Sequence, residues 1–315
     1  MSVTQDLFDR FRLTLLERRL EVYGVHVWMK NRREAEFRFR ADDKVNLHSA
    51  AKAVAALAVA FCEEEGRLSL CDKVLDFFPE YKAIAAPGSE EITLLHLMHM
   101  QSGKTRGMWF GGRYTERELY ERDWAELFFK EPMADKPGTV FSYANQNTYM
   151  LLRVVEQVTG ERTVDYLNPR LFLPLEIYNP LWRSCPRGHC VGATDLFLRT
   201  SELAKIGRLY LLRGEWRGKR LLGESYFDRA VGDIVSTKEA CPGDPETEAG
   251  YGYQLWLGAE KGTWRIDGKY GQFCIGLPEL GAVVTVTAHE ERDPYAIVRA
   301  VTNDIVPALT WTSGT

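Results

Sequence analysis

Strand patterns stand at both ends of this 315-residue chain, and helical patterns fill its middle. Residues 22–29 are β-branched and aromatic, and residues 34–40 alternate apolar and charged side chains, so the pair predicts a hairpin. Further strand patterns occur at residues 251–257, 263–266 and 281–287. Because residues 92–230 are mostly helical in pattern, we expect the two ends to share one antiparallel sheet with a helical region inserted.

This arrangement predicts an α+β fold. The sheet region would consist of residues 1–45 and 245–315, and the mostly helical region of residues 46–244, with the functional site between them. Amphipathic spacing over residues 4–20 and a last helical pattern over residues 295–309 predict terminal helices that flank the sheet.

A serine and a lysine open the apolar run of residues 53–62. Residues three apart lie on one face of a helix, so the Ser49 hydroxyl and the Lys52 amine would lie within hydrogen-bonding reach, a nucleophile beside a base. We expect the helix to begin at or just before Ser49, where unpaired backbone N–H groups and the helix dipole would stabilise an oxyanion. Ser-x-x-Lys also occurs by chance in many chains, so the motif alone does not establish catalysis.

Composition narrows the class of protein. Apolar residues make up 45% of the chain and charged residues 27%, which is ordinary for a globular protein. The formal net charge is −4 with Lys and Arg spread along the chain, so no nucleic-acid or membrane partner is expected. Because the first residues lack a basic segment followed by an apolar one, we expect a cytoplasmic protein, and the oligomeric state stays open.

Two segments imitate ligand-binding motifs. Residues 185–190 hold two cysteines and a histidine but lack a fourth ligand at a usual zinc spacing, which favours a turn with free thiols. Gln-Ser-Gly-Lys-Thr at residues 101–105 is like the tail of a phosphate-binding loop, but Met98 stands where that loop needs a glycine. The sequence therefore predicts no metal and no other cofactor.

Two later motifs could complete the chemistry. Tyr143 and Asn145 follow a Pro-Gly turn in a predicted loop, and Lys269 and Gly271 stand where one late strand gives way to the next. Ser-x-x-Lys, Tyr-x-Asn and Lys-x-Gly, in this order and at these separations, resemble the motifs of serine hydrolases that include class C β-lactamases, DD-peptidases and related carboxylesterases. Four more stretches match phrases usual in this family, at residues 92–103, 137–143, 172–176 and 202–210.

The resemblance covers nearly the whole chain and implies a β-lactamase/transpeptidase-like fold. It implies that Ser49 is the acylated nucleophile. Burial and a second cation at Lys269 would lower the pKa of Lys52, and nearby ammonium groups would lower that of Tyr143. Either group could then accept the Ser49 proton, and the sequence does not decide between them. Asn145 would contact a substrate amide or the Lys52 amine.

By the same resemblance, the strand after Lys269 would line the pocket. Gly271 would let a substrate approach the backbone, and the N–H of Gln272 would form the oxyanion hole with that of Ser49. Tyr270 replaces the small hydroxyl residue that helps β-lactamases and DD-peptidases hold a carboxylate, and Phe273 beyond it is apolar. Both departures favour other substrates.

The leading hypothesis is a metal-free hydrolase that forms an acyl-Ser49 intermediate on a small ester or amide. One alternative is a β-lactamase or DD-peptidase, and another is a non-catalytic binding or sensor module on the same fold. Three aromatic residues in turn-rich stretches would either line the substrate cleft or pack inside the protein: Trp109, Phe110 and Trp182.

Overall fold

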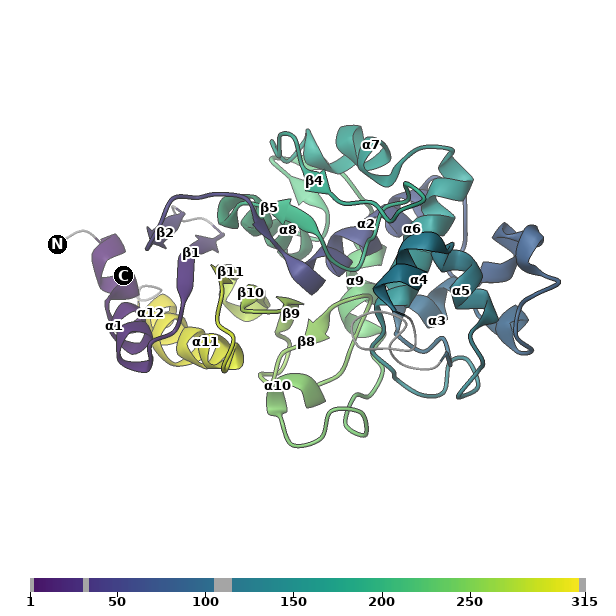
Figure 1. Cartoon of the computed structure of the whole chain (residues 1–315). Coiled ribbons are helices and arrows are strands. Elements are labelled where there is room, and N and C mark those ends of the chain that lie inside the picture. The colour runs from purple at the N-terminus through teal and green to yellow at the C-terminus, as the bar shows by residue number, and fades with distance from the viewer. Residues whose placement is uncertain (1–2, 31–33, 105–114, 312–315) are drawn as a thin grey trace.

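A computed structural model describes residues 3–30, 34–104 and 115–311 of the chain (Figure 1). Its main sheet is antiparallel throughout, in the order β2-β1-β11-β10-β9-β8. The strands are β1 (Val22–Met29), β2 (Ala35–Arg38), β8 (Trp256–Leu257), β9 (Trp264–Gly268), β10 (Gln272–Leu277) and β11 (Ala282–Ala288). Strands from both ends of the chain therefore share one sheet, as predicted. The turn expected at residues 31–33 lies outside the described residues.

The terminal helices cover one face of this sheet. Phe11 and Leu15 of α1 (Val3–Arg18) pack with Val284 of β11 and Ile297 of α11 (Tyr295–Ala300) in one apolar cluster. Figure 1 shows the first and last helices side by side at one end of the molecule. The last helical pattern is divided, because a π-helical segment, Val301–Ile305, separates α11 from α12 (Val306–Trp311).

The opposite face of the sheet packs against α8 (Thr200–Leu211), behind which lies the helical region. Gly207 permits close approach, since a Cβ at that position would lie 2.0 Å from the Cys274 Sγ of β10. The α2 helix (Ala51–Glu64) is buried from Ala51 to Cys62 and packs against α6 (Asn145–Thr159). This core also includes Ile266 of β9, so it joins the helical region to the sheet.

The rest of the helical region consists of short elements. Its helices are α3 (Leu94–Met98), α4 (Glu116–Glu121), α5 (Trp124–Lys130), α7 (Thr163–Leu167), α9 (Glu224–Gly232) and α10 (Pro245–Glu248), with a π-helical segment at Asn168–Phe172. The 3₁₀ turns of the helical region are His48–Ala50, Val74–Phe77, Pro79–Tyr81 and Ser89–Glu91. A further 3₁₀ turn, Pro278–Leu280, connects β10 to β11. Two small sheets contain β3 (Val45–Asn46), β4 (Leu181–Trp182) and β5 (Leu196–Leu198), and β6 (Glu215–Trp216) and β7 (Lys219–Arg220).

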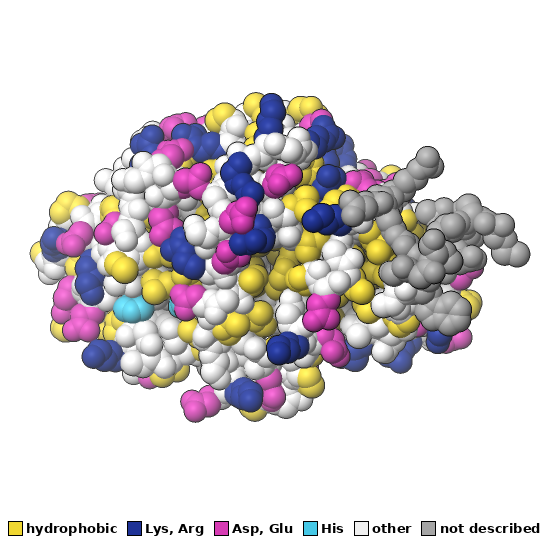
Figure 2. Space-filling model, turned by 180° about the vertical axis from the view of Figure 1, so that it is seen from behind, with side chains coloured by type: hydrophobic (Ala, Val, Ile, Leu, Met, Phe, Trp, Pro, Cys, Tyr) yellow, Lys and Arg dark blue, Asp and Glu magenta, His cyan; other side chains and the backbone are white. Residues whose placement is uncertain are grey.

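The surface carries charges of both signs. On the face drawn in Figure 2, Lys and Arg side chains are interspersed with Asp and Glu, in keeping with the small net charge. Among the helices of the described ranges, none has the length and apolar character needed to cross a membrane.

The predicted strand at residues 251–257 is mostly wrong. Only Trp256–Leu257 is a strand, β8, because the chain reverses within the stretch and Tyr251 forms a bridge with Trp256. Gly250, with φ +118°, and Gln254, with φ +61°, take the left-handed conformations on either side of this reversal.

Candidate active site

Ser49 and Lys52 lie where a 3₁₀ turn, His48–Ala50, leads into α2. The sequence predicted a helix that begins at or before Ser49, and the chain does become helical there, first as 3₁₀ and then as α. Lys52 Nζ donates to Ser49 Oγ over 2.9 Å, which brings together the two groups of the first motif. His48, just before Ser49, has φ +48°, a conformation uncommon for a residue with a side chain.

The Lys52 amine is buried, with 1% of the residue exposed. Besides Ser49 Oγ, it donates to Asn145 Oδ1 over 2.8 Å and to the Ala193 carbonyl oxygen over 2.9 Å. Burial lowers the pKa of Lys52 to about 7, and the negative charge of Asp267 opposes this shift. The expected direction is therefore correct, and burial is its main cause. A neutral amine at this position can accept the Ser49 proton near pH 7.

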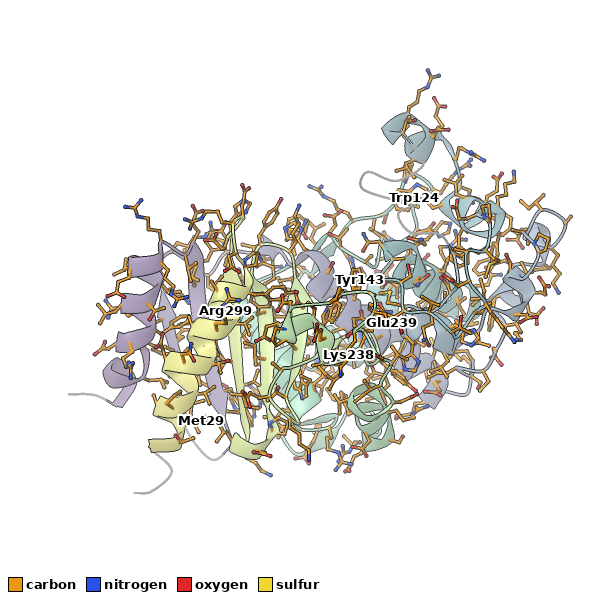
Figure 3. The ribbon with its side chains drawn as sticks, turned by 90° about the horizontal axis from the view of Figure 1, so that it is seen from below. Met29, Trp124, Tyr143, Lys238, Glu239 and Arg299 are labelled. Atoms are coloured by element: carbon orange, nitrogen blue, oxygen red, sulfur yellow. The ribbon has the colours of Figure 1, made fainter. Side chains whose placement is uncertain are left out.

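The Tyr143 ring lies beside the same amine. Lys52 Nζ is 4.8 Å from the ring centroid, and Trp256 stacks on the ring at 5.7 Å between centroids. In Figure 3, Tyr143 lies toward the middle of the molecule, between the sheet and the helical region. Burial raises the pKa of Tyr143 well above its ordinary value, although a hydrogen bond with Ser49 opposes this effect. The predicted lowering of this pKa is therefore wrong, because loss of water disfavours the phenolate more than its neighbours stabilise it.

Asn145 was predicted in a loop, but it occupies the first position of α6, so the loop ends at Ala144. Its Oδ1 accepts from Lys52, so its carbonyl side faces the amine. The second motif thus meets the first across α2 and α6, which pack together.

Lys269 and Gly271 lie in the turn between β9 and β10, beside the 3₁₀ turn that holds Ser49. A Cβ at Gly268, the last residue of β9, would lie 2.2 Å from the Leu47 carbonyl oxygen, so glycine is needed for this close contact. Gly271 has φ +90°, which favours glycine for a second reason. Lys269 is exposed, and its Nζ lies 4.5 Å from the Tyr270 ring centroid.

Gln272 is the first residue of β10 and is 2% exposed. Its side-chain amide donates to the carbonyl oxygens of Ala288, over 2.6 Å, and Lys269, over 3.2 Å. Because these bonds hold the side chain against β11, any contact of Gln272 with a substrate must come from its backbone.

Two imidazoles flank Tyr270. The His289 ring stacks on it at 4.5 Å, and the His48 ring meets it edge-on at 5.1 Å. Burial lowers the pKa of His48, while Asp195 opposes this shift. Phe273 takes no part here, since it is buried and stacked on Tyr295 under the terminal helices. Tyr270 is therefore packed between two imidazoles at the edge of the candidate site.

Some site residues had no signal in the sequence. Ala193 contributes a backbone carbonyl, and Trp256 reads as an ordinary strand aromatic. Trp182 is buried, and its Nε1 donates to the Thr194 carbonyl oxygen over 2.9 Å, so it packs inside the protein. Trp109 and Phe110 lie outside the described residues.

The two segments that resemble ligand-binding motifs, residues 185–190 and 101–105, contain side chains held by contacts within the protein. His189 Nδ1 lies 2.8 Å from Glu156 Oε2, and across the described ranges no group of three or more His, Cys, Asp or Glu side chains could hold a metal ion. Lys104 is buried and donates to Ser89 Oγ and the Glu131 carbonyl oxygen, both over 2.7 Å. Its amine is therefore occupied by contacts within the protein.

The Beta-lactamase family matches residues 18–304 of this chain. The chain belongs to the Beta-lactamase family. Lovastatin esterase of Penicillium rubens is 25% identical to this chain over 296 residues, which cover 73% of each chain. The solved structure of a putative 6-aminohexanoate-dimer hydrolase from Bacillus anthracis matches with a TM-score of 0.78 and 20% identity, over 96% of this chain and 82% of that one.

A second group of relatives matches over a shorter range. Protein flp of Staphylococcus aureus is 27% identical over 134 residues, which are 42% of this chain. The matched part spans only 27% of the length of that protein.

Proposed function

We propose that this protein is a serine hydrolase that acts through an acyl-Ser49 intermediate on a small ester or amide. The observation that carries the proposal is the 2.9 Å contact of Ser49 Oγ with the buried Lys52 amine, whose pKa is lowered to about 7. A neutral amine in this position is a general base at physiological pH.

The reaction would proceed in two steps. Ser49 Oγ attacks the substrate carbonyl carbon while its proton passes to Lys52 Nζ, and the leaving group takes that proton as the acyl-enzyme forms. Water then attacks the acyl carbon and gives one proton to Lys52 Nζ. The bond from the acyl carbon to Ser49 Oγ breaks, Lys52 passes the proton to Oγ, and the acid leaves. The backbone N–H groups of Ser49 and Gln272 would bind the oxyanion, and Lys269 and Gly271 would border the substrate.

Tyr143 would act in its neutral form. Because burial raises its pKa, its hydroxyl can accept a hydrogen bond from Lys52 or donate one to Ser49 or the leaving group without ionising. The low pKa of Lys52 favours the amine as the base, and this choice between the two groups is part of the proposal.

The substrate would lack a carboxylate near the reacting bond. Tyr270, held between His48 and His289, stands where relatives place a small hydroxyl, which disfavours β-lactams and D-alanine peptides. The relative named lovastatin esterase is consistent with an ester substrate.

The test is release of p-nitrophenol from a short-chain ester by the wild type and by Ser49→Ala. Turnover that is lost in the variant supports the acyl-enzyme route. Equal rates in the two proteins contradict it. Faster turnover of a chromogenic cephalosporin than of esters would instead favour the β-lactamase alternative, and stable acylation without release would favour a binding protein.

A further inference from the structure

The side chain of Asn46 bridges two segments that lie far apart in the sequence. Its Oδ1 accepts from the backbone N–H of His48 over 2.8 Å and from that of Asp195 over 3.2 Å. Its Nδ2 donates to Asp195 Oδ1 over 2.6 Å. One amide group therefore holds two backbone N–H groups and one carboxylate.

This bridge begins where the backbone pairing ends. The strands β3 and β5 pair antiparallel, and the bond from the Leu47 N–H to the Leu196 carbonyl oxygen, 2.8 Å long, continues the pairing. The next residues on either side, His48 and Asp195, have φ angles of +48° and +61°. His and Asp tolerate this conformation better than most residues with side chains, and the Asn46 side chain adds one stabilising contact to each of them.

Each bridged segment carries part of the candidate active site. His48 directly precedes Ser49, so the conformation of His48 sets the direction of the nucleophile. Asp195 stands two residues after Ala193, whose carbonyl oxygen accepts from Lys52 Nζ over 2.9 Å. The bridge therefore links the turn of the nucleophile to the acceptor that holds the base.

We propose that Asn46 is a positioning residue that fixes Ser49 relative to Lys52. The inference rests on the proposed function, because it concerns the same serine and lysine. The reactive geometry depends on atoms held to a fraction of an ångström, and a displacement of about 1 Å can reduce a rate about a hundredfold. The side chain of Asn46 bonds to His48 and Asp195, so it would act on Ser49 and Lys52 through these two residues.

The test exchanges the two partners of the bridge. Asn46→Asp places two carboxylates together, Asp195→Asn leaves two amides, and the double variant restores one amide and one carboxylate in reversed order.

The readouts are kcat and KM for the p-nitrophenyl ester and the rate at which a fluorophosphonate labels Ser49. In that labelling the Ser49 oxygen bonds to phosphorus, fluoride leaves, and Lys52 takes the proton. Asn303→Asp, at an exposed position on the terminal π-helical segment, is the control for charge.

We expect Asn46→Asp, which has no side-chain N–H to donate to Asp195, to lose about tenfold or more in kcat and in labelling rate, with little change in KM. Asp195→Asn keeps an oxygen that accepts from Asn46 Nδ2, so it should lose less. The double variant should recover to within about threefold of the wild type, and Asn303→Asp should keep the wild-type rate. Two results would overturn the proposal: an Asn46→Asp variant that keeps the wild-type rate, or a double variant as slow as Asn46→Asp. Opposite rate changes in the two singles would also overturn it, since they would indicate an effect of charge alone.

A readout without substrate separates this inference from the proposed function. The titration of Lys52 can be followed by NMR of the ¹⁵N-lysine-labelled protein, with Lys52→Met to assign the signal. Asn46→Ala adds no charge, and we expect it to lower the pKa of Lys52, because the Ala193 carbonyl no longer stabilises the ammonium form. An unchanged pKa contradicts the positioning role even if the wild type hydrolyses no ester. A lowered pKa in a protein without turnover supports Asn46 and counts only against the proposed function.

Discussion

In the proposed mechanism, proton transfer depends on the side chain of Lys52. It has three oxygen acceptors within 2.9 Å, yet burial still lowers its pKa to about 7. Three hydrogen bonds from one nitrogen suit an ammonium group, whereas proton transfer from Ser49 needs the amine. A lysine balanced between these forms can accept and return a proton near pH 7.

The pH dependence of turnover follows from this pKa. In the proposed mechanism Lys52 accepts a proton only when it is neutral, so kcat/KM should rise about tenfold per pH unit below about pH 7 and level off above it. Initial rates with the p-nitrophenyl ester from about pH 5.5 to about pH 8.5 measure this rise of kcat/KM with pH. Lys52→Arg, which stays charged, should be inactive throughout. A flat profile in the wild type would count against Lys52 as the base.

The same pKa affects stability. The folded pKa of about 7 lies below the ordinary value of 10.5, so between them the unfolded chain binds more protons than the folded one. Relative to Lys52→Met, the wild type should therefore gain stability as the pH rises from about 7 to about 9, by up to about 1.4 kcal/mol per pH unit. Urea unfolding at both values measures the difference. Lys238→Met, at an exposed lysine labelled in Figure 3, should show no such trend.

For single residues, the sequence predicted which side chains meet in the site better than it predicted their pKa values. The contact of Ser49 with Lys52 followed from helical spacing alone. The direction of the Tyr143 pKa did not, because it depends on burial beside Trp256, which no local pattern records. The Ala193 carbonyl was also beyond prediction, since a backbone acceptor has no signature in the side chains.

At the scale of the element, close packing of α8 on the sheet depends on Gly207. A Cβ there would lie 2.0 Å from Cys274 Sγ and 2.9 Å from Val283 Cγ1, distances that real contacts do not show. Gly207→Ala should lower the free energy of unfolding by about 1–3 kcal/mol. Cys274→Ala removes the nearest atom, so the double variant should lose less than the sum of the single variants.

Denaturant unfolding of the four proteins measures this coupling. Gly232→Ala is the matched control, because Gly232 has no other atom near its missing Cβ, and it should change stability little. Additive losses in the double variant would show that Cys274 is not the source of the strain.

Elements with a strong apolar period were the predictable ones. The β1–β2 hairpin and α1 follow their patterns closely. The sequence did not predict the division of the last helix, because α-helical and π-helical turns bury similar positions. The sequence marks the change only by Pro307, which has no backbone N–H. The reversal at Tyr251 was missed because buried aromatic residues in a tight turn have the composition of a strand.

At the scale of the whole molecule, the helical region and the sheet share one core. The same apolar cluster contains α2, α6 and the Cys274 and Val283 side chains of β10 and β11. We therefore expect one cooperative unfolding transition, although the domain boundaries drawn from the sequence stay a prediction. Calorimetry tests this, because the calorimetric and van 't Hoff enthalpies should agree. Two resolved transitions would contradict it.

The pairing of β1 with β11 has a consequence for synthesis. Val22 pairs with Ala288, so β1 leaves the ribosome long before its partner exists. At roughly 5–20 residues per second, the wait is on the order of tens of seconds. During that time the β1–β2 hairpin exposes an open strand edge and an apolar face that another nascent chain could join. The sheet can therefore close only after residues 282–288 have been synthesised.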